Sequence, residues 1–243
     1  MTNFIGDAKL AYGTKTYNYS AGADYRLSEN YRRQFLPLVN PGHPGLTPSV
    51  IKSANSRHFV SLVKFIEPTS FLNSFNRIKS AIGRALPEDA YQFSSPELTH
   101  LTIAGLGDQM GFNLGVLPEQ VSAALMRVPP VRVQIRGAWL NNFILGRGFL
   151  RVYPEAGDIS GANRISELIR RVGGKDWNVY PIGFVQLTRD LTSSETSRLV
   201  KIFKCFEEEV FAETLQIDRL SLVSHSNDLL INHNILAEIS LSR

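Results

Sequence analysis

The chain has 243 residues, of which 43% are hydrophobic and 20% charged, so it can bury a sizeable core and is not a wholly disordered protein. The net charge of +4 is modest and is spread along the sequence, which suits an anionic ligand without requiring one. The single cysteine excludes an internal disulfide, and the short apolar runs exclude a membrane-spanning helix. We therefore expect a cytoplasmic monomer with no membrane partner.

The first 56 residues differ from the rest because they are rich in Tyr, Gly, Asn and Pro. A short helix is predicted only at residues 28–38, with Ser28 as its cap. We expect residues 1–56 to form an irregular extension that packs on the main domain, residues 57–243. The tyrosines of the extension are better suited to anchoring it than to stacking on nucleic-acid bases.

From residue 57 onward, the hydrophobic periodicity indicates regular elements that occur in the same order twice. The first set is a strand at 57–66, a helix at 69–86, a strand within 99–108, a helix at 118–127 and a strand at 131–140. The second set is a strand at 148–153, a helix at 160–172, a strand at 181–188, a helix at 193–212 and a strand at 217–224. This duplication predicts an α+β fold of two similar lobes, each a mainly antiparallel sheet backed by helices, with a groove between them.

Residues 99–108 carry groups that are suited to phosphate chemistry. Because side chains alternate along a strand, His100 and Thr102 share one face while Leu101 takes the other. An imidazole can move a proton at neutral pH, and a hydroxyl can hold an oxygen on which negative charge grows. The function then depends on whether the chain supplies a second such pair.

The duplicated order gives this strand a counterpart at residues 184–188. There, Gln186 and Thr188 share one face of the predicted strand. Two strand-borne polar pairs that face a common groove would make one site between the lobes. We therefore expect His100, Thr102, Gln186 and Thr188 to line that groove.

The first motif resembles that of the 2H phosphoesterase superfamily, which includes RNA 2',3'-cyclic phosphodiesterases and 2',5'-RNA ligase-like proteins. That family has His-x-Thr, an apolar stretch and then Leu-Gly-acidic, as in residues 100–108 here. Three further features agree: the helix start Pro118-Glu119, the first strand opened by Arg57-x-Phe59, and the last strand at 217–224. The resemblance covers residues 57–243 and implies a phosphodiesterase-like enzyme that needs no cofactor and acts on a 2',3'-cyclic phosphate, a nucleotide or an RNA phosphodiester.

In that family, two histidines act as general base and general acid, and hydroxyl groups hold the phosphoryl oxygens. The resemblance implies an acid/base role for His100 and phosphate-holding roles for Thr102 and Thr188. The second motif of the family falls on residues 186–188, where Gln186 replaces the histidine. Glutamine can bind phosphate but cannot shuttle a proton, so on this interpretation Gln186→His would raise the activity.

Three outcomes stay open for the missing histidine. His100 alone supports a slower reaction, or another histidine supplies the second acid/base group, or the site binds its ligand without turnover. The candidates for replacement are His58, on the first strand, and His225, just after the last one.

The strand at 148–153 should lie next to a catalytic strand, so one of its faces looks into the groove. Phe149, Arg151 and Tyr153 share a face that suits a phosphate and a base. The opposite parity, with Leu150 and Val152 in the groove, stays open. The expected substrate contacts are Gln186, Arg151, Tyr153 and Phe59.

Other chemistries find less support in the sequence. The glycines at 105, 107 and 111 are partly similar to a dinucleotide-binding fingerprint, but the next helix begins only near Pro118. The five histidines are scattered and lack nearby Cys or paired carboxylates, so no metal site is expected. The alternative functions are a weakened or inactive module that binds nucleotide or RNA ends, and a family member recruited to unrelated small-molecule chemistry.

Overall fold

The computed structural model of the protein describes residues 24–34, 36–40, 42, 47–48, 58–67, 69, 72–140, 146–173, 180–226, 229–230 and 232–242. In these residues the strands form one nine-stranded, entirely antiparallel sheet with the order β7-β4-β5-β6-β3-β1-β8-β9, and β2 pairs with β6. The strands are β1 (Phe59–Phe65), β2 (Tyr91–Phe93), β3 (His100–Asp108), β4 (Val131–Leu140), β5 (Arg147–Pro154), β6 (Tyr180–Leu187), β7 (Val210–Ile217), β8 (Arg219–His225) and β9 (His233–Ser240). The fold is therefore α+β, as the sequence predicts.

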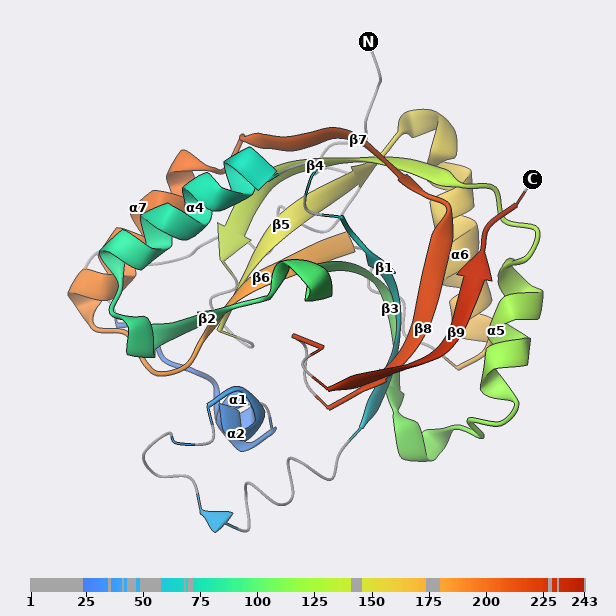
Figure 1. The fold of residues 1–243 in the computed structure, drawn as a ribbon, viewed down its shortest axis with the longest axis horizontal. Helices are drawn as coiled ribbons and strands as arrows, with labels where there is room; N and C mark the ends of the chain where they lie inside the picture. The colour runs from blue at the N-terminus through green and yellow to red at the C-terminus, as the bar shows by residue number, and fades with distance from the viewer. Residues whose placement is uncertain are drawn as a thin grey trace.

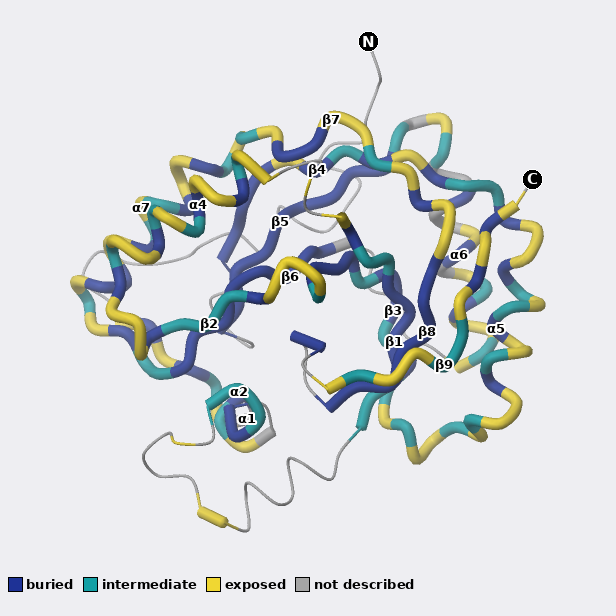
Figure 2. Tube along the Cα trace, in the orientation of Figure 1, coloured by how far each residue is buried: buried dark blue, intermediate teal, exposed yellow. Residues whose placement is uncertain are grey.

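Two pairs of helices lie outside the curved sheet, α4 with α7 on one side and α5 with α6 on the other (Figure 1). The described helices are α1 (Glu29–Gln34), α2 (Leu36–Val39), α4 (Leu72–Ala85), α5 (Leu117–Leu125), α6 (Ile159–Arg171) and α7 (Ser193–Cys205). The helix pairs mix the two predicted lobes, because α4 and α5 belong to the first predicted lobe and α7 and α6 to the second. Figure 2 shows the strands at the centre as buried and the outward surfaces of the helices as exposed.

Two lobes meet at a single seam between β3 and β6, but they are not the predicted ones. The prediction puts β4 in the first lobe and β8 in the second, and the order of strands in the sheet reverses both. At this seam Leu101 pairs with Ile182, and both side chains are fully buried in the core. One lobe contains β1, β3, β8 and β9, and the other contains β4 to β7, so the sheet continues from one lobe into the other. The residues that flank Leu101 and Ile182 on the two strands therefore come together at the centre of the molecule.

The C-terminal part of the chain departs from the prediction. The helix expected at 193–212 ends at Cys205, and β7 (Val210–Ile217) follows it. β7 pairs along β4, which gives its backbone the hydrogen bonds that a longer helix would have supplied locally. β9 is also absent from the prediction because its polar sequence, HNILAEIS, shows no clear alternation.

Part of the N-terminal extension packs on the second lobe. Tyr25, Leu27, Tyr31 and Leu36 are buried in the core. Ser28 accepts a hydrogen bond from the backbone N–H of Tyr31, as expected for a helix cap. The rest of the predicted extension, including residues 1–23, lies outside the described residues. No described helix is long and apolar enough to cross a lipid bilayer.

Candidate active site

A small, largely enclosed cavity of about 60 Å³ lies at the seam between the lobes. Strands from both lobes line it, so it lies where the sequence predicts the groove. The lining residues are Ser61, Val63, His100, Thr102, Gly105, Arg147, Phe149, Pro181, Gly183, His225 and Leu230.

His100 begins β3 and is only 3% exposed. Its Nδ1 lies 2.8 Å from the carbonyl oxygen of Leu98, and a carbonyl can only accept, so Nδ1 carries the proton. In a neutral ring this tautomer makes Nε2 the basic atom, which is the form that a general base requires. Thr102, two residues along the same strand, lines the cavity with His100. The predicted His100 and Thr102 pair is thus assembled at one cavity wall.

A second histidine reaches the same cavity from β8. His225 is 4% exposed, and its Nε2 lies 2.8 Å from the hydroxyl oxygen of Ser61 on β1. The pairing of Phe59 with His225 at the ends of β1 and β8 sets this register, and the two rings lie 6.1 Å apart. The cavity therefore holds two histidine and hydroxyl pairs, His100 with Thr102 and His225 with Ser61.

The other candidate for replacement, His58, does not line the cavity. It lies one residue before β1, where its carbonyl oxygen accepts a hydrogen bond from the N–H of Gln109. Phe59 also lies outside the lining, although its ring contacts that of His225. Of the two candidate histidines, the fold brings only His225 to the cavity.

Gln186 and Thr188 lie outside the cavity. Because Ile182 pairs with Leu101 in an antiparallel ladder, Gly183 lies opposite His100 and Pro181 lies opposite Thr102, and both line the cavity. Gln186 is four residues beyond Ile182 on β6, which is roughly 13 Å in an extended strand. Its amide donates to the carbonyl of Gly146, and the hydroxyl of Thr188 donates to the carbonyl of Asp89.

β5 contributes Arg147 and Phe149 to the cavity. Of the two possible faces of this strand, the one that carries Phe149 therefore faces the cavity, and the one that carries Leu150 and Val152 does not. Arg151 and Tyr153 are buried beyond the lining, and a guanidinium N–H of Arg151 donates to the carbonyl of Glu207. Arg147 is the functional candidate that the sequence reasoning missed. It precedes the predicted strand by one residue, and extending the same alternation backward from Phe149 would have found it.

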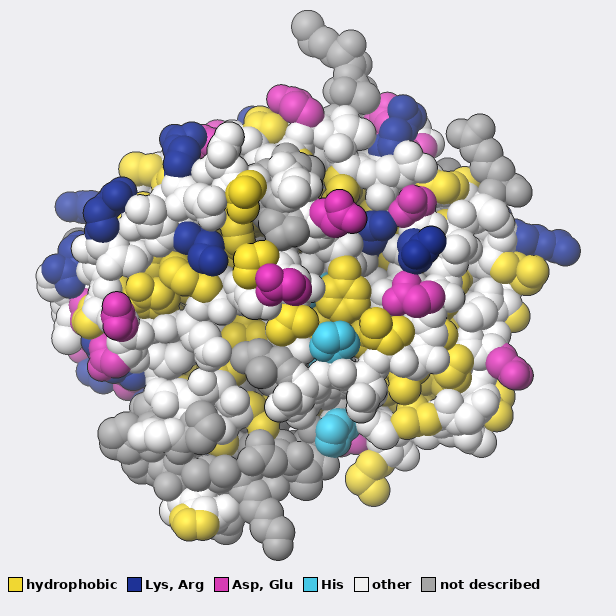
Figure 3. All heavy atoms as spheres, viewed as in Figure 1, with side chains coloured by type: hydrophobic (Ala, Val, Ile, Leu, Met, Phe, Trp, Pro, Cys, Tyr) yellow, Lys and Arg dark blue, Asp and Glu magenta, His cyan; other side chains and the backbone are white. Residues whose placement is uncertain are grey.

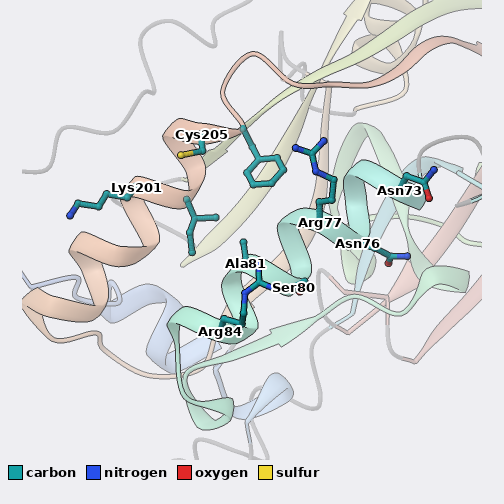
Figure 4. Close-up of a pocket in the computed structure, with 10 residues that line it drawn as sticks. Asn73, Asn76, Arg77, Ser80, Ala81, Arg84, Lys201 and Cys205 are labelled. Carbon is teal, nitrogen blue, oxygen red and sulfur yellow. Dashed lines mark hydrogen bonds between the residues drawn. The ribbon is translucent and has the colours of Figure 1, made fainter.

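A larger hollow, of about 660 Å³, lies between α4 and α7 (Figure 4). Arg77, Arg84 and Lys201 project along it, and no histidine lines it. Arg77 is paired with Glu209 and stacks over the ring of Phe206. This hollow therefore carries positive charge without the imidazole that the cavity at the seam has.

Figure 3 shows one face of the molecule, on which acidic and basic side chains alternate without a large patch of either sign. No group of three or more His, Cys, Asp or Glu side chains that could hold a metal ion occurs within the described residues. The cavity at the seam is therefore the candidate active site.

No family model and no curated protein matches the sequence. Similar solved structures include TT0787 of Thermus thermophilus, with 13% identity over 75% of this chain and 97% of that one and a TM-score of 0.49. LigT of Escherichia coli, solved with NADP+, has 16% identity over 77% and 100% of the chains and a TM-score of 0.47. Usb1 of Kluyveromyces marxianus, solved with uridine monophosphate, has 11% identity over 77% and 99% and a TM-score of 0.45. At 11% to 16% identity, these likenesses concern the fold alone.

Proposed function

We propose that the protein is a phosphodiesterase-like enzyme that works without a metal ion on a 2',3'-cyclic phosphate or another nucleotide or RNA phosphodiester. The observation that carries the proposal is the pair of buried histidines, His100 and His225, on one cavity, each accompanied by a hydroxyl group. Two imidazoles can divide the work of a general base and a general acid. In this proposal His225 supplies the second acid/base group, because the chain has Gln186 at the position of the family's second histidine.

Hydrolysis of a cyclic phosphate at this site needs two proton transfers. One imidazole takes a proton from water as the water oxygen bonds to phosphorus. The other gives a proton to the ribose oxygen as its bond to phosphorus breaks, so the ring opens to a phosphate monoester. The tautomer of His100 suits the base, and in this proposal the hydroxyls of Thr102 and Ser61, which line the cavity, donate to the phosphoryl oxygens.

Activity measurements with a panel of 2',3'-cyclic nucleotides and short oligonucleotides test this proposal. We expect weak but measurable hydrolysis by the wild type, and His100→Ala should lower the rate by about two to four orders of magnitude because it removes one proton-transfer group. The matched control is His58→Ala, since His58 lies one residue before β1 and does not line the cavity.

A binding module is the second candidate function, and one observation favours it. β6 carries Gly183 opposite His100 and Pro181 opposite Thr102, so this strand brings no proton carrier or hydroxyl to the cavity. Nucleotide binding without turnover of any phosphodiester in the panel would support the module over the enzyme. Absence of both binding and turnover would contradict both functions.

A further inference from the structure

Arg147 is a buried cation at the wall of the candidate active site. It begins β5, is 7% exposed, and lines the cavity together with His100 and His225. Its guanidinium carries a permanent charge and several N–H groups in a fixed fork, a geometry that suits the oxygens of a phosphate. A cation beside two proton-transfer groups is well placed to attract an anion and to hold it between them.

The position of Arg147 depends on the absence of a side chain at Gly183. A Cβ atom at position 183 would lie 2.9 Å from Cζ of Arg147 and would overlap its Nη2. The antiparallel register of β3 and β6 places Gly183 opposite His100, and the guanidinium of Arg147 occupies the space that a side chain at position 183 would need. A side chain at position 183 and the present position of the guanidinium therefore exclude each other.

Two further observations limit the size and the orientation of an anion that could bind to Arg147. The guanidinium stacks over the ring of Phe149, with Cζ 5.1 Å from the ring centroid, which limits the orientations of its N–H groups. A volume of 60 Å³ gives room for about four or five water-sized groups, enough for phosphoryl oxygens and too little for a nucleobase. An enclosed cavity of this size recognises the phosphoryl group and leaves the nucleoside outside.

From these observations we infer that Arg147, seated in the space left by Gly183, is the residue that binds the phosphoryl group of the substrate. The inference rests on the proposed function in taking a phosphoester as the ligand. It adds that recognition depends on the phosphate and hardly on the base. Inorganic phosphate should therefore bind in the same cavity and compete with the substrate.

Titration calorimetry with inorganic phosphate tests the inference without any turnover. We expect Arg147→Gln to weaken phosphate binding about 10- to 100-fold, as for the loss of charge-assisted hydrogen bonds, and Arg147→Lys to weaken it less. The matched control is Arg84→Gln, which makes the same charge change on exposed α4. Circular dichroism and thermal unfolding establish that each variant is folded.

Gly183→Ala gives an independent test because it displaces the guanidinium without removing it. We expect this variant to weaken phosphate binding as Arg147→Gln does, and the double variant Arg147→Gln/Gly183→Ala to be no weaker than Arg147→Gln alone. Gly111→Ala is the control, since a Cβ there meets no atom within 4 Å. Additive losses in the double variant would contradict the inference.

The outcomes separate the inference from the proposed function. Unchanged phosphate affinity in Arg147→Gln, together with hydrolysis that still requires His100, would overturn the role of Arg147 and leave the function standing. Phosphate binding that requires Arg147, in a protein with no phosphodiesterase activity, would uphold the anion site and overturn the enzyme. A strong preference among the nucleobases of otherwise equal substrates would contradict recognition through the phosphate.

Discussion

The two histidines of the cavity are held in different ways, and this difference decides what each can do. His100 is fixed by a carbonyl two residues away, which sets its tautomer locally. His225 is held against Ser61, which is 164 residues away in the sequence. Ser61 can accept from a protonated His225 or donate to a neutral one, so it suits a ring that changes its protonation state during the reaction. Both states are needed in a general acid that is reprotonated after each turnover.

The position of Gln186 leads to a prediction at this scale that reverses the one from the sequence alone. Since Gln186 lies outside the cavity and donates to the carbonyl of Gly146, Gln186→His places no imidazole at the phosphate. We expect its hydrolysis rate to stay within about twofold of the wild type. The substitution costs about 1 to 3 kcal/mol of fold stability, so the rates are compared at equal folded fraction. Steady-state rates on a cyclic nucleotide would check this, and a tenfold gain would contradict the assignment of the second histidine to His225.

At the scale of single elements, the start of α7 is the best-connected helix end among the described residues. Thr192 and Glu195 form a capping box, each accepting a hydrogen bond from the backbone of the other. Arg189 bonds both Glu195 and Asp89, which ties the helix to the turn after α4. α7, which packs on β4 and α4, is thereby fixed near the end of β6.

Glu195 gives this network a pH dependence. Hydrogen bonds from Arg189, opposed by the cost of burial and aided by bonds from Thr192, lower the pKa of Glu195 from 4.5 to about 2. Because the folded-state pKa is the lower one, this stabilisation is fully present above pH 4.5 and is lost as the pH falls through about 2.

We therefore expect Glu195→Gln to lower the free energy of unfolding at pH 7 by about 1 to 3 kcal/mol, and the difference from wild type to shrink between pH 5 and pH 2. Urea unfolding at several pH values measures this. Glu29→Gln is the matched control, since Glu29 is also in a first helical turn but pairs with Arg33 in solvent, so a change below about 0.5 kcal/mol is expected. A difference that does not vary with pH would contradict the role of the charge.

At the scale of the whole molecule, the described part of the extension is fastened to the second lobe. Tyr25 and Leu191 exchange backbone hydrogen bonds, and the hydroxyl of Tyr31 donates to the carbonyl of Leu187, 3.0 Å away. Asp190 accepts from the N–H of Leu27 and pairs with Arg32. The extension therefore covers the end of β6 and contributes to the core.

This attachment predicts the behaviour of the extension in limited proteolysis. Asp190→Ala should remove 1 to 2 kcal/mol from the local stability of residues 24–34 and so raise the rate of tryptic cleavage after Arg32 or Arg33 by about 5- to 30-fold. Mass spectrometry of timed digests locates the cleavage. Asp218→Ala is the control, because Asp218 pairs with Lys64 far from the extension, and an equal acceleration in both variants would indicate general destabilisation.

Features that depend on local sequence were predictable, whereas those that depend on strand pairing were not. The motif at His100, the helix caps and the alternation of β4 each depend on residues that are close together in the sequence. The pairing of Leu101 with Ile182 is not, so the sequence predicts Gln186 in the groove, whereas the structure places Pro181 and Gly183 at the cavity. His225 could be named only as one of two candidates, because its partner Ser61 comes from a distant strand.

The central claim is that His100 and His225 form one acid/base pair, and the pH dependence of kcat/KM for His225→Gln tests it most directly. We expect the wild type to give a bell-shaped profile, since two groups must be in opposite protonation states, and the variant to lose one limb and at least about 100-fold in rate. A variant that keeps both limbs and the wild-type rate would contradict the claim.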